Sequence, residues 1–326
     1  MAPLCLLYFV VVGSWLGAAG LLVERALPRP APRRWIWCTT LVMSVGLPML
    51  LSATHSSHVI GLWGHEVARM PAADRALADG ASSTLHNLLD CSASLSQDLF
   101  RIWLIGTALV LAWAAGSAWR VRRTIRGAST RRGASAAAVV EGVPVIVTDN
   151  LGPATAGMWR SQVLMPRWAL ALPTVQRRYV VRHEDEHRRS RDVALLGAAS
   201  VLVALMPWNF ALWWQLRRLR LAVEMDCDAR VVASLGDPAG YGELLLTVAT
   251  ASSRGPRLQP ALLGAGLLER RLVALVAPHR PRAITWVLSA AAAALLVAIV
   301  LSVPHPEPAR EAGAPHAHSG ASRGAE

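Results

Sequence analysis

The chain is organised around residues 180–189, which read VVRHEDEHRR. This stretch contains His183, Glu184 and His187 in the spacing HExxH. Residues four apart lie on the same face of an α-helix, so the two imidazoles can bind one metal ion. The glutamate beside the first histidine can then reach a water molecule at that ion. Nitrogen and carboxylate ligands with one open position suit Zn²⁺, which lowers the pKa of its water to about 7.

The sequence around the motif predicts a helix. Leu172-Pro173-Thr174 is typical of a helix start, with Thr174 as the N-cap, and no Gly or Pro follows until Gly197. The alternative is a charged surface helix whose two histidines are solvated. Because HExxH also occurs by chance, the helical context is what favours the metal site.

A third metal ligand is expected downstream, at Glu224. Residues 220–228 read RLAVEMDCD, which places Glu224 and Asp228 four apart on one helix face. Glu224 can complete a site with His183 and His187. Asp228 can accept the other ring N–H of a ligand histidine and so fix its tautomer. The alternative is an acidic face that pairs with the surrounding arginines, but the combination with HExxH favours the metal site.

These motifs resemble those of the BlaR/MecR-type integral-membrane zinc metallopeptidases, gluzincins related to antibiotic-sensing antirepressors. The likeness spans residues 1–303 and rests on HExxH, on Arg188-Arg189-x-x-Asp192, on Pro207-Trp208-Asn209 and on Glu224-x-x-Cys227-Asp228. The resemblance implies a zincin-like (gluzincin) protease domain, mainly α with an α+β part, that uses Zn²⁺. The sequence lacks the large extracytoplasmic penicillin-binding sensor of the best-known members, and this argues against β-lactam sensing.

Composition predicts a membrane protein with one sizeable soluble domain. Hydrophobic residues make up 53% of the 326 residues, and the mean hydropathy is +0.36. The net charge of +12 comes from arginine, since the chain has no lysine. Basic residues beside membrane spans explain this charge better than nucleic acid does, so no direct nucleic-acid binding is expected. Cys227 lies close to Glu224 in the sequence, but it is expected to pack in the core and not to bind the metal.

Four apolar segments are each long enough to cross a bilayer, and the positive-inside rule places the arginine-rich segments in the cytoplasm. This predicts a multi-pass protein of a bacterial plasma membrane with four transmembrane helices. The segments in order are a span at 1–23, a cytoplasmic basic loop at 24–34, a span at 35–53, an extracytoplasmic loop at 54–100, a span at 102–119, a basic linker at 120–133, the cytoplasmic protease domain at 134–280, a span at 283–303 and a short disordered outer tail at 304–326. Three histidines in the outer loop are expected to be solvated: His55, His58 and His65.

A fifth apolar segment, residues 193–214, is also long enough to span. If it crossed the membrane, His183 and Glu224 would lie on opposite sides and could not share a metal. Pro207 interrupts the segment and Asn209 is polar at the interruption. The helix through His187 is therefore expected to continue into this segment, which then folds back as two helical pieces, with its depth in the bilayer left open.

The arginines around the motif argue against an intramembrane site, because each guanidinium would cost several kcal/mol at the bilayer midplane. A cytosolic helix can keep these side chains solvated, turn them toward anionic lipid head groups, or offer them to an acidic substrate. The arginines are Arg177, Arg178, Arg182, Arg188, Arg189 and Arg191.

Further elements are expected within the protease domain. Residues 143–148 and 162–165 are typical of short strands, and the free edge of their sheet could hold an extended peptide by strand addition. Gly236-Asp237-Pro238 should end the helix of Glu224, and a further helix is expected at 241–250. If the protein cuts itself, the linker at 251–260 or the stretch near Arg270-Arg271 should be accessible.

The expected function is zinc-dependent hydrolysis of peptide bonds on the cytoplasmic side, with Glu184 as general base. By resemblance, the target is a transcriptional repressor of the BlaI type, cut in response to a signal. Two alternatives stay open: a housekeeping HtpX-like quality-control endopeptidase, and a non-catalytic signalling scaffold, against which the intact Glu184 argues. The expected partners are a protein or peptide substrate and the lipid bilayer, and a homodimer is left open.

Overall fold

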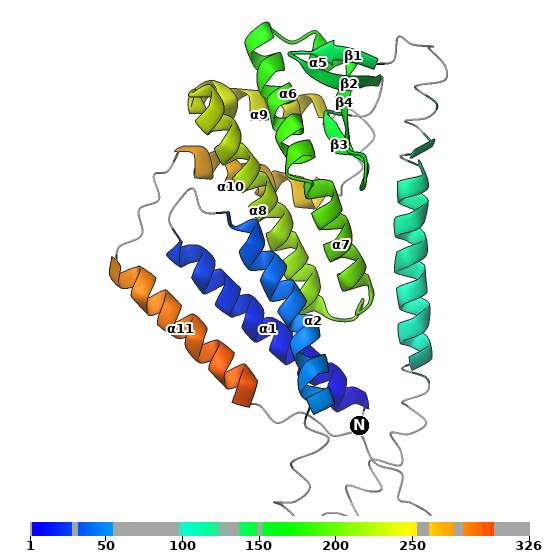
Figure 1. Cartoon of the computed structure of the whole chain (residues 1–326), viewed down its shortest axis with the longest axis vertical. Coiled ribbons are helices and arrows are strands. Elements are labelled where there is room, and N and C mark those ends of the chain that lie inside the picture. The colour runs from blue at the N-terminus through cyan, green and yellow to red at the C-terminus, as the bar shows by residue number, and fades with distance from the viewer. Residues whose placement is uncertain are drawn as a thin grey trace, which may run out of the picture.

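The computed structural model describes residues 2–27, 32–54, 98, 100–120, 122–123, 127, 137–148, 152–252, 261–276 and 283–302. These residues are mostly helical and include one small sheet (Figure 1). The expectations for the outer-loop histidines, for the linker from 253 to 260 and for the tail from 304 fall outside the described residues.

Helices occupy all four segments that were predicted to span. They are α1 (Ala2–Ala26), α2 (Arg34–Thr54), an unlabelled helix at Phe100–Arg120 and α11 (Ala283–Ser302). Among the described residues, the helices Leu6–Ala26 and Phe100–Arg120 are long and apolar enough to cross a membrane. Figure 1 shows α1 lying between α11 and α2, and it contacts both.

The sheet has four strands in the order β1-β2-β4-β3. The strands β2 (Val143–Thr148) and β4 (Gln162–Pro166) confirm the prediction and pair in parallel. The structure adds β1 (Ala137–Val140) and β3 (Ala154–Ala156), both antiparallel edge strands. Glu141 and Gly142, with φ of 51° and 78°, form the two-residue turn between β1 and β2, as hairpins favour.

The short helix α5 (Arg167–Leu170) leads to α6 (Thr174–Arg189), which carries HExxH. The prediction of Thr174 as N-cap is wrong by one residue. Pro173 is the N-cap, with an extended backbone (φ −50°, ψ 146°), and its carbonyl accepts the first helical bond from Arg177 N at 2.9 Å. Thr174 therefore already has a helical backbone, and the cap residue, a proline, has no side-chain acceptor for the first amides.

The helix of HExxH does not continue into the next apolar segment, and this corrects the expectation of one continuous helix. Arg191 adopts the left-handed conformation (φ 54°), so the chain turns between α6 and α7 (Asp192–Ala204). A left-handed residue breaks the run of i→i−4 bonds, which is why a new helix starts at Asp192. Figure 1 shows α7 continuing away from the sheet beside α8.

Residues 193–214 fold back as two helical pieces, as predicted. α8 (Phe210–Leu235) returns along α7, and the side chain of Asn209 caps it by accepting from Ala211 N at 3.1 Å. The 26 residues of α8 extend about 39 Å, because each helical residue rises about 1.5 Å. The hairpin therefore brings Glu224 back to the level of α6, where it faces the two histidines.

The first half of α8 packs against α1 and α2 (Figure 1). Trp37, Leu41, Leu212 and Leu216 form the centre of this contact and are nearly inaccessible. Gln215 is fully buried there and donates to Gly13 O at 2.7 Å and to Ser44 Oγ at 3.0 Å. The buried amide of Gln215 thus has partners on both neighbouring helices.

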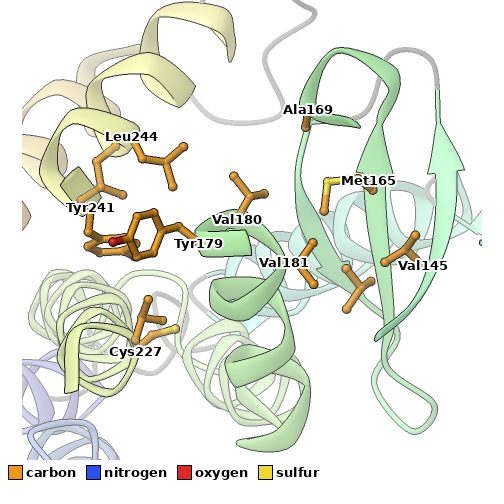
Figure 2. Close-up of a cluster of buried hydrophobic side chains, with 12 residues drawn as sticks. Val145, Met165, Ala169, Tyr179, Val180, Val181, Cys227, Tyr241 and Leu244 are labelled. Atoms are coloured by element: carbon orange, nitrogen blue, oxygen red, sulfur yellow. The ribbon is translucent and has the colours of Figure 1, made fainter. Parts of the chain in front are cut away.

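A second core joins α6, the sheet, α8 and α9 (Pro238–Ser252), with α10 (Ala261–Val276) packed against it. Figure 2 shows Val181 and Met165 between α6 and the sheet, and Tyr179 beside Tyr241 above Cys227. Gly236 ends α8 in the left-handed conformation (φ 76°), as predicted. The helix expected at 241–250 is confirmed as part of α9.

Candidate metal centre

His183 and His187 project from one face of α6, one turn apart. Their rings are nearly perpendicular, and the two Nε2 atoms lie 3.2 Å apart. Both side chains are largely buried, at 14% and 11% exposure. The spacing HExxH therefore produces the convergence that the sequence predicted.

Glu224 faces this pair from α8. Its two carboxylate oxygens lie 3.6 Å from His183 Nε2 and 3.7 Å from His187 Nε2. In a tetrahedral zinc site with bonds of about 2.0–2.1 Å, neighbouring donor atoms lie about 3.3–3.4 Å apart. The three measured separations, 3.2, 3.6 and 3.7 Å, are close to these donor–donor distances, so the donor set fits one zinc ion.

The remaining nitrogen of His187 is held by Asp192, the first residue of α7. His187 Nδ1 lies 2.8 Å from Asp192 Oδ2, and the Asp192 side chain is only 2% exposed. A carboxylate on Nδ1 fixes the ring with its proton there and leaves Nε2 free to bind a metal. Asp192 was part of the motif Arg188-Arg189-x-x-Asp192, but no function in the metal site was predicted for it.

The remaining nitrogen of His183 is held through Tyr241 on α9. The Tyr241 hydroxyl lies 2.9 Å from His183 Nδ1 and donates to Asp228 Oδ1 at 2.7 Å. Asp228 itself is 3.6 Å from His183 Nδ1, so the tyrosine lies between the two groups that were expected to bond directly. Burial and the charge of Asp228 raise the pKa of Tyr241, which keeps its hydroxyl a donor.

Arg271 on α10 completes the acidic side of the site. It bonds Asp228 through two nitrogens, at 2.8 and 2.7 Å, and its Nη1 lies 3.0 Å from Glu224 Oε2. Its side chain is 13% exposed. In the stretch near Arg270-Arg271, which was expected to be accessible if the protein cuts itself, Arg270 is exposed. The Arg271 guanidinium is not, because ion pairs to two carboxylates hold it inside the site.

Cys227 is fully buried in the core, as predicted, but it also lies close to the histidines. Its Sγ is 3.4 Å from His183 Nδ1, and His183, His187 and Cys227 offer donor atoms within 4.8 Å of one another. The thiol faces the nitrogen of His183 that Tyr241 also contacts, whereas Glu224 faces both Nε2 atoms. One ring cannot bind the same ion through both nitrogens, so we favour Glu224 as the third donor.

Glu184 lies beside the ligands and is 6% exposed. The Thr155 hydroxyl in the edge strand β3 is a donor to two oxygens of Glu184, its backbone carbonyl at 2.7 Å and its carboxylate at 3.0 Å. This contact fixes the edge strand against the helix of HExxH. An extended peptide added to β3 would consequently run past Glu184.

The charges around the site favour a cation at its centre. Burial opposes charge on both rings, but Cys227 and Glu224 raise the pKa of His183 to about 10. For His187, burial is likewise outweighed by Asp192 and Cys227, which raise the pKa to about 12. Burial would raise the pKa of Glu224, yet Arg271 and the histidines hold it well below its usual range. A metal ion would supply the same positive charge.

Several arginines around the motif are bound by carboxylates of the same domain. Arg188 and Arg189 both bond Asp185, each at 2.6 Å, and Arg182 bonds Glu186 at 2.8 Å. Arg177 also pairs with Glu141, at 3.4 Å, so carboxylates of the domain bind four of the six guanidiniums that were considered for solvent, lipid or an acidic substrate.

A cavity of about 510 Å³ opens over the site. Its lining includes both histidines, Glu184 and Glu224, together with apolar side chains from α7, α9 and α10. These apolar residues include Val193, Leu196, Leu244, Leu245, Val248 and Leu268. The volume and lining are typical of a site for a ligand with apolar side chains.

A helix with HExxH that faces a glutamate on a second helix is the arrangement of a metallopeptidase site. The chain belongs to the BlaR1 peptidase M56 family, whose profile matches residues 5–275. It is thus a member of a family of membrane-associated metallopeptidases. Searches of curated proteins and of solved structures gave no match.

Proposed function

We propose that this protein is a zinc-dependent endopeptidase of the membrane. The observation that carries the proposal is the convergence of His183 Nε2, His187 Nε2 and the Glu224 carboxylate at 3.2–3.7 Å. These separations and donor types support Zn²⁺ as the ion. The neighbouring Glu184 supports catalysis over a purely structural metal.

The residues of the site then have distinct tasks. Bound Zn²⁺ would polarise the scissile carbonyl and lower the pKa of water to about 7. Glu184 takes a proton from the attacking water and passes it to the leaving amine. Thr155 holds the Glu184 carboxylate, while Asp192 and Tyr241 hold the two ligand rings. The apolar walls of the cavity exclude bulk water around the reacting bond.

We further propose four transmembrane helices, with the protease domain at 134–280 in the cytoplasm of a bacterial cell. The lengths of α1, α2, α11 and the helix Phe100–Arg120 support this, as do the arginines beside each proposed inner end. The hairpin of α7 and α8 keeps both halves of the metal site on one side.

The proposed substrate is a protein regulator, a transcriptional repressor of the BlaI type cut in response to a signal. Membership of the BlaR1 family supports this assignment. The edge strand β3 beside Glu184 and the apolar cavity support a substrate that binds as an extended segment with apolar side chains.

The test compares the detergent-purified wild-type chain with Glu184→Gln, Glu224→Ala and, as a control, Glu243→Gln, whose residue is exposed on α9. Zinc content is measured, and cleavage of casein and of a BlaI-type repressor is followed. We expect about one zinc in wild type, Glu184→Gln and the control, and strong loss of zinc in Glu224→Ala. Cleavage by Glu184→Gln should fall by about 10²–10⁴-fold.

Each contrary outcome identifies what is wrong. Full zinc and activity in Glu224→Ala would mean that the third ligand lies elsewhere, with Cys227 the next variant to make. Cleavage of casein without cleavage of the repressor would favour the quality-control endopeptidase. A wild-type protein that binds no zinc would favour the non-catalytic scaffold.

A further inference from the structure

The N-terminus of α2 is bound by the helix that carries Glu224. The Asp226 carboxylate accepts from Arg33 N at 3.1 Å and from Arg34 N at 3.0 Å. Arg33 directly precedes α2 and Arg34 is its first residue, so no carbonyl of the helix can reach either amide. A carboxylate there also complements the positive end of the helix dipole. Since Asp226 lies two residues after Glu224 in α8, the start of α2 is fixed close to the metal site.

The side chain of Arg34 extends from the same point to the support of His187. Arg34 Nη1 bonds Asp192 Oδ1 at 3.0 Å, and Asp192 Oδ2 bonds His187 Nδ1 at 2.8 Å. One carboxylate therefore uses one oxygen for the arginine and the other for the ligand ring. Arg34 is 17% exposed and Asp192 is 2% exposed, so the pair is shielded from water.

A buried carboxylate depends on its cation, because an unpaired charge in the interior is costly. The other arginine that faces Asp192 is Arg230, whose Nη2 lies 3.8 Å from Oδ2 and whose Nε bonds Glu186 at 3.0 Å. Arg34 is consequently the closer cation of Asp192. Without it, the Asp192 carboxylate would reorient toward Arg230 or water and would no longer hold the His187 ring in one place.

We propose that Arg34 is a positioning residue that holds His187 through Asp192 and so couples the metal site to the membrane helix α2. The proposal rests on the proposed metal site and extends it to the regulation of that site. At its other end α2 leads into the loop at 54–100, which is predicted to lie outside the membrane. A shift of α2 along its axis would move Arg34 and change the affinity for zinc.

The first experiment measures the zinc dissociation constant of the full chain in detergent by chelator competition. The variants are Arg34→Ala, Arg34→Lys and Asp192→Asn. The matched control is Arg177→Ala, because Arg177 is also on the protease side, 28% exposed and paired with a carboxylate, Glu141, at 3.4 Å. We expect Arg34→Ala and Asp192→Asn to weaken zinc binding by about 10–100-fold, as for other residues that support a metal ligand.

The double variant decides whether Arg34 acts through Asp192. Arg34→Ala added to Asp192→Asn should cause little further loss, since residues in one network are not additive. Arg34→Lys keeps the charge and should recover part of the affinity, and it replaces Arg34→Ala if that variant does not fold. Zinc affinity within about twofold of wild type in both Arg34 variants, or fully additive losses, would overturn the proposal.

A second measurement needs no variant. Coupling between two sites is reciprocal, so a helix that sets zinc affinity must itself be stabilised by zinc. Hydrogen exchange at residues 34–41 should therefore slow when zinc is added to the wild-type chain, whereas exchange in the helix Phe100–Arg120 should not change. Zinc binding without protection of α2 would overturn the coupling while leaving the proposed function intact. Absence of zinc binding would instead defeat the proposed function.

Discussion

At the scale of single residues, the two ligand histidines are supported in different ways. His187 bonds a carboxylate directly, at 2.8 Å from Asp192. His183 contacts the hydroxyl of Tyr241 at 2.9 Å, and the hydroxyl passes the interaction on to Asp228. A neutral hydroxyl can accept one hydrogen bond and donate another, so Tyr241 can link the His183 ring to the Asp228 carboxylate and orient the ring in its place. Arg271 then balances the charge of Asp228 and Glu224.

This arrangement predicts the effect of Tyr241→Phe. The substitution removes the hydroxyl and leaves His183 Nδ1 buried with no oxygen partner at bonding distance from α9. We expect the zinc dissociation constant to rise by about 10-fold or more, since residues that hold a ligand histidine typically contribute 10–100-fold. Chelator competition on the purified chain measures this.

Tyr179→Phe is the matched control for Tyr241→Phe. The two rings pack against each other at 5.8 Å, but the Tyr179 hydroxyl bonds Asp237 at 3.0 Å, away from the metal ligands. Removal of that hydroxyl should leave zinc affinity unchanged. If both variants bind zinc as tightly as wild type, Tyr241 packs beside His183 without orienting it.

At the scale of elements, α8 connects the two parts of the molecule. Its first half contacts α1 and α2, and its second half carries Glu224 and Asp228 (Figure 1). Glycines on α1 allow the close approach. A Cβ at Gly17 would lie 2.7 Å from the Trp214 ring, and one at Gly20 would lie 2.7 Å from Thr40. Small residues at helix contacts serve this purpose in membrane proteins.

We therefore expect Gly17→Val to destabilise the packing of α1 on α8. The added side chain must displace Trp214, and overpacking typically costs about 1–3 kcal/mol. The melting temperature of the detergent-purified protein should fall. Gly46→Val is the control, because it makes the same change in α2 at a position where a Cβ meets nothing within 4 Å. Equal melting temperatures for the two variants would show that α1 and α8 tolerate a wider separation.

At the scale of the whole molecule, the hairpin of α7 and α8 decides where the active site can be. α7 leads away from the sheet-bearing end and α8 returns to it, so α6 and the second half of α8 face each other (Figure 1). The site therefore lies near the C-terminal end of α1 and the N-terminal end of α2, where Arg34 and Asp226 meet. In the proposed topology, this position suits a substrate that arrives from the cytoplasm.

The predicted topology can be tested with reporter fusions in a bacterial host. A periplasm-dependent phosphatase should be active when fused after residue 75 or after residue 310, and inactive after residue 130 or 255. A fluorescent protein that matures only in the cytoplasm should give the opposite pattern. Activity of the phosphatase at 255 would place the protease domain outside and reverse the proposed orientation.

The local elements and the principal candidate residues can be predicted from the amino-acid sequence. The four-residue spacings placed His183 with His187, and Glu224 with Asp228, because helical periodicity depends only on separation along the chain. The incompatibility between a crossing at 193–214 and a shared metal predicted the helical hairpin. Strands β2 and β4 and the long helices followed from runs of apolar residues and their turn signals. The ligand roles themselves stay predictions.

The residues that surround the ligands could not be predicted, because they come from elements far apart in the sequence. Tyr241, Arg271 and Thr155 come from α9, α10 and β3, and no local spacing links them to His183, Glu224 or Glu184. Asp192 lies five residues after His187, and on one continuous helix it would point about 140° away, at 100° per residue. The left-handed Arg191 redirects the chain and brings Asp192 to the ring. Side-chain partners across elements depend on how helices pack, and packing is set by the whole chain at once.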